Sequence, residues 1–126
     1  MRYLLDTTTL IDHAMGRHGA PEVIARLFSE PNDLYTCDVV VAEALSGGPP
    51  EERAVIAGLI RVLEYVSTHP DAAVWAADSR YARGATGART LADAIIGGVA
   101  WSLNATVVTR NPKDFERLGV PVLTYG

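Results

Sequence analysis

The segment Thr106-Val107-Val108-Thr109 constrains the fold of this chain most strongly. It is β-branched throughout and carries no charge, which favours a strand that is buried on both faces. Such strands belong to parallel sheets, whose connections cross over through helices. A second apolar run, Tyr3 to Leu5, is followed by apolar residues at helical spacing from Leu10 to Met15. We therefore expect an α/β fold with a central, mostly parallel sheet flanked by helices.

The rest of the chain continues the alternation of strands and helices. Further strands are expected at 34–36, around 66 and at 121–124, and further helices at 19–28, 39–45, 51–65, 74–82, 91–103 and 111–118. Two sets of residues are expected in the core: Val55, Ile56, Leu59, Ile60 and Leu63 of the helix at 51–65, and the aromatic pair Trp75 and Trp101. A length of 126 residues fits one domain, 1–126.

Composition narrows the class of function. The chain has 15 acidic and 11 basic residues, a net charge of −4, so phosphate neutralisation by the protein alone is weak. Cys37 is the single cysteine, which excludes an intrachain disulfide and a cysteine zinc site. No export signal and no apolar stretch near 20 residues is visible, so we expect a cytoplasmic protein without membrane association.

Four acids stand where an α/β sheet binds ligands, beyond the carboxyl ends of its strands. Asp6 and Asp114 follow expected strands, whereas Glu43 and Asp93 lie in apolar helical segments. Each has a structural alternative. Asp6 is a favoured N-cap, Glu43 can face solvent, and Asp93 and Asp114 fit capping boxes that begin at Thr90 and Asn111.

Taken together, these acids indicate a site for a hard cation. Carboxylates without histidine or cysteine are the ligands that Mg²⁺ and Mn²⁺ prefer. A bound cation would also present positive charge to phosphate from an acidic protein.

Four segments in order resemble PIN-domain ribonucleases, and more narrowly the VapC-type toxins of toxin–antitoxin pairs. They are 5–12 (LDTTTLID), 41–45 (VAEAL), 91–96 (LADAII) and 108–115 (VTRNPKDF). The resemblance implies that Asp6, Glu43, Asp93 and Asp114 form the metal site, with Thr8 and Thr109 in support. Some relatives carry an acid where this chain has Asn111, which leaves open whether Asn111 or Asp114 completes the site.

The resemblance also implies an activity. It is that of a Mg²⁺- or Mn²⁺-dependent endoribonuclease that cuts structured RNA, such as transfer or ribosomal RNA, and is neutralised by a cognate VapB-like antitoxin. Asp6 and Asp93 would be the principal ligands, Glu43 would hold or orient water, and Asp114 would complete a weaker second site. One or two ions are compatible with this set. The apolar surface of the helix at 51–65 suits a homodimer or antitoxin interface, and core burial explains it equally well.

Basic residues near the same edge are candidates for contacts with the RNA backbone. They are Arg83, Arg89, Arg110 and Lys113, and for the arginines a solvated surface is the structural alternative. Asp12 is expected to lie outside the site, so Asp12→Asn should leave RNA cleavage nearly unchanged.

Three other functions remain as alternatives: a catalytically silent PIN-like module that binds RNA or protein, a haloacid-dehalogenase-like phosphatase, and a receiver domain. The phosphatase needs a second Asp where Thr8 stands, and the receiver domain has only Asp38 as its phosphate acceptor.

Overall fold

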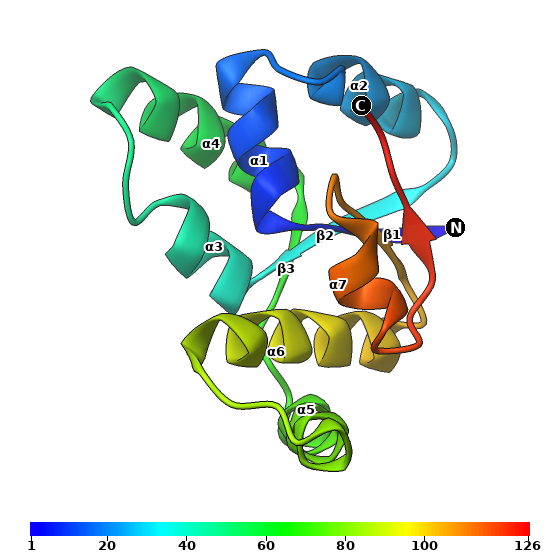
Figure 1. Ribbon diagram of the computed structural model, residues 1–126. Coiled ribbons are helices and arrows are strands. Elements are labelled where there is room, and N and C mark those ends of the chain that lie inside the picture. Colours follow the sequence, from blue (N-terminus) through cyan, green and yellow to red (C-terminus); the bar gives the residue numbers. More distant parts are fainter.

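The sheet forms the centre of the molecule (Figure 1). The structure is a computed structural model that describes the backbone of residues 1–126 and every side chain except that of Arg89. Its strands are β1 (Arg2–Leu5), β2 (Asp33–Cys37), β3 (Glu64–Val66), β4 (Thr106–Val108) and β5 (Val122–Leu123). They form one sheet in the order β3-β2-β1-β4-β5, and every pairing is parallel. The expected parallel α/β fold is confirmed.

Seven helices connect and cover the strands. They are α1 (Thr7–Met15), α2 (Ala20–Ser29), α3 (Asp38–Ala44), α4 (Pro50–Val62), α5 (Pro70–Arg83), α6 (Ala88–Leu103) and α7 (Pro112–Glu116). In Figure 1, α1, α2 and α4 lie on one side of the sheet and α6 on the other, with α5 packed against the outer side of α6. Within the described part of the chain, no helix combines the length and apolarity that crossing a bilayer requires.

The strand order places a natural binding position at the ends of β1 and β4. The chain builds β2 and β3 on one side of β1 and then returns to place β4 on the other side. Ligands of α/β proteins bind where the strand order reverses in this way, beyond the carboxyl ends of the strands. Leu5 and Val108 are register partners at these ends and are fully buried. Asp6 and Thr109, the residues that follow them, therefore lie side by side at this edge of the sheet.

A close crossing fixes α5 against α6. A Cβ built on Gly98 would lie 2.5 Å from the backbone oxygen of Ala72, and one on Gly97 would lie 2.8 Å from the side chain of Leu118. Only glycine leaves enough room for the backbones to approach this closely. Gly98 thus sets the position of α5, whereas Gly97 leaves room for the Leu118 side chain.

Three expectations are wrong: the end of one helix and the burial of Val55 and Trp101. The helix expected at 51–65 ends at Val62, and Glu64–Val66 forms the edge strand β3 instead, because its backbone pairs with β2. Within that helix, Val55 is 44% exposed. Trp101 is 50% exposed, and it stacks on Trp75 with ring centroids 5.9 Å apart. This stack lies at the rim of the α5–α6 contact, so one face of the Trp101 ring remains in solvent.

Candidate active site

Asp6 is the buried centre of the first group of site residues. It caps α1, where its Oδ1 accepts a hydrogen bond of 2.7 Å from the Thr7 backbone N–H. Its Oδ2 accepts from two hydroxyls, Thr109 at 2.8 Å and Thr8 at 3.1 Å. The structure thus brings together three of the residues singled out from the sequence. It also confirms the capping role that was the structural alternative for Asp6.

The environment of Asp6 favours its neutral form. The carboxyl group is only 4% exposed, and this burial raises its pKa. Hydrogen bonds from the three threonines oppose the shift, while the nearby charge of Glu43 adds to it, and the pKa remains raised. No described side chain forms an ion pair with Asp6. A cation at this position would remove the cost of the buried charge.

Glu43 is coupled to Asp6 through Thr7, a residue that the sequence reasoning missed. The Thr7 hydroxyl donates a 2.7 Å hydrogen bond to Glu43 Oε1, while its backbone N–H serves Asp6. Glu43 is otherwise exposed at the end of α3. The sequence held a signal for this role of Thr7. Its hydroxyl directly follows Asp6, so Thr7 and Asp6 both lie at the start of the same helix. Asp6 and Glu43 form what we call the first acid pair.

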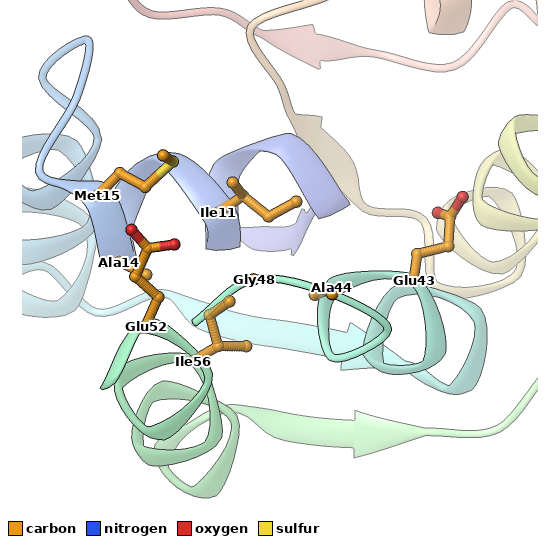
Figure 2. Close-up of a pocket in the computed structure, with 9 residues that line it drawn as sticks. Ile11, Ala14, Met15, Glu43, Ala44, Gly48, Glu52 and Ile56 are labelled. Atoms are coloured by element: carbon orange, nitrogen blue, oxygen red, sulfur yellow. The ribbon is translucent and has the colours of Figure 1, made fainter. Parts of the chain in front are cut away.

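Glu43 also stands at one end of an apolar hollow of about 310 Å³. Figure 2 shows Glu43 and Glu52 at opposite ends of this hollow. Between them lie residues of α1, α3 and α4, including Ile11, Ala44 and Ile56. The hollow therefore has an apolar floor and an acid at each end.

Asp93 and Asp114 form the second acid pair. Both are half-buried, and both line a small cavity of about 40 Å³ together with Arg83, Thr90 and Arg117. Asp93 reaches this cavity from α6 and Asp114 from α7, two helices that pack against each other. The topology thus joins acids that lie 21 positions apart in the sequence.

The capping boxes expected for these two acids do not form. The helix α6 begins at Ala88 after the N-cap Gly87, so Thr90 lies inside its first turn and its hydroxyl donates to the Gly87 carbonyl at 3.0 Å. Asn111 is the N-cap of α7, but its side chain makes no capping hydrogen bond. Capping therefore does not account for the positions of Asp93 and Asp114.

The two acid pairs lie at the same edge of the sheet. Thr109, which donates to Asp6, also accepts a 3.0 Å hydrogen bond from the backbone N–H of Asn111, the residue at which α7 begins. Among the residues with described side chains, no three acids, histidines or cysteines gather around one point as ligands of an ion. The four acids thus form two pairs and no closed cage.

The donor chemistry of these pairs fits a hard divalent cation. The groups that could ligate an ion are carboxylate and hydroxyl oxygens, the donor type that Mg²⁺ and Mn²⁺ prefer. Mg²⁺ in particular is held by one or two carboxylates and keeps several waters. Asp114 shares a cavity with Asp93, whereas Asn111 lines the neighbouring hollow.

Arg110 and Asp12 have roles that the sequence did not indicate. Arg110 Nε donates to Asp12 Oδ2 at 2.8 Å, and the Tyr125 hydroxyl donates to the same oxygen at 2.8 Å. Asp12 is 3% exposed. It lies outside the two acid pairs, and its burial and hydrogen bonds give it a structural role that the sequence reasoning missed. Its buried carboxylate accepts the hydrogen bonds that connect α1 to Arg110 and to Tyr125 near the end of the chain.

The other basic candidates differ in their surroundings. Lys113 is exposed and lines a hollow of about 320 Å³ beside α7, and Arg83 is exposed at the cavity of the second acid pair. The RNA contact expected of Arg89 lies outside the described side chains. Arg117 lines both spaces and was missed. Its position three residues after Asp114, on the same helical face, was the signal for it.

Asp38 has a structural role. It accepts hydrogen bonds from the Thr68 hydroxyl at 2.7 Å and the Thr68 backbone N–H at 3.1 Å. Burial pushes the pKa of Asp38 upward, but hydrogen bonds from Thr68 and Val39 outweigh it and the pKa is lowered. Asp38 therefore ties the end of β2 to the segment after β3, which gives the receiver-domain alternative no support.

Comparisons with known proteins agree with this architecture. None of the curated protein sequences compared with the chain matches it. Among solved structures, it is similar to a chain of VapBC2 from Rickettsia felis bound to a promoter DNA fragment, with a TM-score of 0.82, 19% identity and 100% of each chain covered. It is also similar to a chain of DNA-bound VapBC from Salmonella typhimurium, with a TM-score of 0.79, 25% identity and 98% of each chain covered.

A third similar structure is VapC20 from Mycobacterium tuberculosis, described as a Sarcin-Ricin loop cleaving toxin. Its TM-score is 0.66 at 19% identity, with 83% of this chain and 86% of that chain covered. The family model of the PIN domain matches residues 3–121. This range contains β2, β3 and β4, all of β1 except its first residue, and both acid pairs. The resemblance read from the four sequence segments is confirmed, and the chain belongs to the PIN-domain family.

Proposed function

We propose that this protein is a Mg²⁺- or Mn²⁺-dependent endoribonuclease and the toxin of a toxin–antitoxin pair. One observation carries the proposal. In a PIN fold, two acid pairs stand at the edge where the strand order reverses, and Asp6 is buried there with a raised pKa and no described cationic partner. Such a site attracts a divalent cation, and a divalent cation attracts phosphate.

The residues of the chain prepare this edge for hydrolysis of a phosphodiester bond. Thr8 and Thr109 fix the orientation of the Asp6 carboxylate, and Thr7 fixes one oxygen of Glu43. The other Glu43 oxygen faces solvent, where it orients water for attack on phosphorus. Asp93 and Asp114 of the second acid pair supply further carboxylate oxygens. When bound, a divalent cation supplies the positive charge that activates water and stabilises the leaving oxygen.

The family comparisons support a class of substrate and a partner for this chain. The similar structures include toxin–antitoxin complexes and a toxin that cleaves the Sarcin-Ricin loop. We infer that this chain acts on structured RNA, transfer or ribosomal, and that a VapB-like antitoxin neutralises it. The apolar hollow with an acid at each end suits a partner segment that carries apolar and basic side chains.

Cleavage of total cellular RNA tests the proposal. The purified protein is incubated with RNA in Mg²⁺, in Mn²⁺ and in chelator, and the new 5′ ends are sequenced. We expect cleavage at defined positions with either ion and none in chelator. Asp93→Asn removes a ligand charge and keeps the shape of the side chain, so we expect the rate to fall by at least about 100-fold.

Asp78→Asn is the matched control. Asp78 is exposed on α5 and lines none of the described hollows of the site, so its replacement leaves the rate unchanged. Cleavage by Asp93→Asn at the wild-type rate would remove Asp93 from the metal site. A folded wild-type protein that cuts no RNA with either ion would favour the silent PIN-like module instead.

A further inference from the structure

Two hollows meet at α7. The small cavity of the second acid pair and the larger hollow beside α7 share two lining residues, Asp114 and Arg117. The larger hollow is also lined by Asn111 and Lys113. Because the two spaces share these lining residues, they are neighbours on the surface, with Asp114 and Arg117 between them.

The arginines that line the small cavity form no ion pair with a described acid. Neither Arg83 nor Arg117 forms an ion pair with another described side chain, although both line a cavity with Asp93 and Asp114. An arginine whose role is to neutralise a carboxylate usually binds it directly through paired N–H groups, as Arg110 does with Asp12. The guanidinium groups of Arg83 and Arg117 therefore remain able to bind an anion from outside.

The sizes of the two spaces indicate what can enter each. A volume of about 40 Å³ exceeds the roughly 10–15 Å³ that one water needs, so the small cavity admits an ion or a phosphate oxygen but no nucleotide. The larger hollow, at about 320 Å³, falls within the range of pockets that hold small molecules, roughly 300–1,000 Å³. It has room for a nucleotide.

We propose that Arg117, with Arg83 across the small cavity, binds a backbone phosphate of the RNA next to the second acid pair. The adjoining nucleotide then lies in the larger hollow, where Lys113 contacts the next phosphate. The planar guanidinium offers two parallel N–H groups to phosphate oxygens, which fixes the orientation of the phosphate as well as its position. This inference rests on the proposed ribonuclease function and names the residue that positions its substrate.

Binding of RNA without cleavage separates the inference from that function. The affinity of wild-type protein for a fluorescent single-stranded RNA oligonucleotide is measured by anisotropy in chelator at several salt concentrations. Arg117→Gln should weaken binding by about tenfold, the loss of one charge-assisted contact. The slope of log affinity against log salt should become shallower by about 0.7. Arg117→Lys restores the charge and should recover part of the affinity.

Two further measurements distinguish substrate binding from a structural role. The urea midpoint of Arg117→Gln should equal that of the wild type, because Arg117 is exposed. Mn²⁺ should stabilise Arg117→Gln at lower concentrations than the wild type, because a positive charge beside Asp93 and Asp114 has been removed. Arg61→Gln, on the exposed surface of α4, is the control and should change none of these quantities.

The result that overturns the inference is RNA affinity in Arg117→Gln that equals the wild type at every salt concentration. Weakened binding that comes with a lower urea midpoint and is not recovered in Arg117→Lys also overturns it, because Arg117 would then be structural. Cleavage by the wild type in Mn²⁺ decides the proposed function separately. A protein that cleaves RNA but is indifferent to Arg117→Gln keeps its function and loses this inference.

Discussion

Replacing Asp12 by asparagine should destabilise the protein although it lies outside the acid pairs. Asp12 is 3% exposed, and its Oδ2 accepts hydrogen bonds of 2.8 Å from both Arg110 and Tyr125. Asparagine has the same shape and can still present one oxygen, but that oxygen is neutral. Its amide N–H groups would also face the Arg110 guanidinium, which now donates to Asp12 Oδ1 at 3.5 Å.

The size of this destabilisation follows from the two hydrogen bonds whose acceptor becomes neutral. Hydrogen bonds to a charged group contribute about 1.5–3 kcal/mol and neutral ones about 0.5–1.5 kcal/mol, so each bond loses about 1 kcal/mol. The Arg110 side chain is 38% exposed and can be solvated after the change, which keeps the cost below that of a fully buried pair. We expect the free energy of unfolding to fall by about 2 kcal/mol. For a domain of this length, this lowers the melting temperature by about 8 °C.

Urea unfolding at neutral pH measures this change. Asp78→Asn, an exposed acid on α5, is the control for a lost surface charge and should stay within about 0.5 kcal/mol of the wild type. In a double-mutant cycle, Asp12→Asn and Arg110→Gln should be coupled by about 1 kcal/mol. If the midpoint of Asp12→Asn coincides with that of Asp78→Asn, the buried pair contributes nothing and the reasoning fails.

Two further predictions concern the site edge and the helix crossing. Burial and the charge of Glu43 raise the folded-state pKa of Asp6, so its ionisation destabilises the metal-free protein at neutral pH. Asp6→Asn should then unfold at higher urea than the wild type at pH 7 in chelator. The difference should shrink as the pH falls through the raised folded-state pKa and should vanish below the ordinary aspartate pKa of 3.8, where the wild-type group is protonated in both states. It should also shrink when Mn²⁺ at matched ionic strength stabilises the wild type, and a difference that is independent of pH would contradict this account. Gly98→Ala should lower the melting temperature, because its Cβ would lie 2.5 Å from the Ala72 backbone oxygen and this clash outweighs a gain in helix propensity of about 1 kcal/mol; a higher melting temperature would refute the close crossing.

Local pattern was sufficient to predict the sheet and to identify the acids. The β-branched run at 106–109 and the apolar run before Asp6 form the adjacent strands β4 and β1, because burial on both faces leaves little freedom in how such segments fold. Asp6, Thr8 and Thr109 meet as expected, since parallel strands end at one edge. The assignment of four acids to a metal site stays a prediction.

Contacts between distant positions could not be predicted. The bonds that join Asp12 to Arg110 and Tyr125 span 98 and 113 positions, and no periodicity relates such residues. The end of the helix at 51–65 was misplaced because its last residues continue an apolar helical pattern, while pairing with β2 converts 64–66 into a strand. Trp101 was assigned to the core because its helix is apolar, whereas α5 covers only part of that face.

The position of β1 in the middle of the sheet also affects when the molecule can fold during synthesis. Its second neighbour, β4, is made about 100 positions later, and the hydrogen bond from Thr109 to Asp6 spans 103 positions. At about 5–20 residues per second, a nascent chain carries Asp6 for several seconds before Thr109 exists. Pairings this distant in sequence also form slowly once the chain is available. A nascent chain that stops between residues 94 and 108 has Asp6, Glu43 and Asp93 but neither Thr109 nor Asp114. Interrupted translation therefore yields fragments that lack part of the candidate active site.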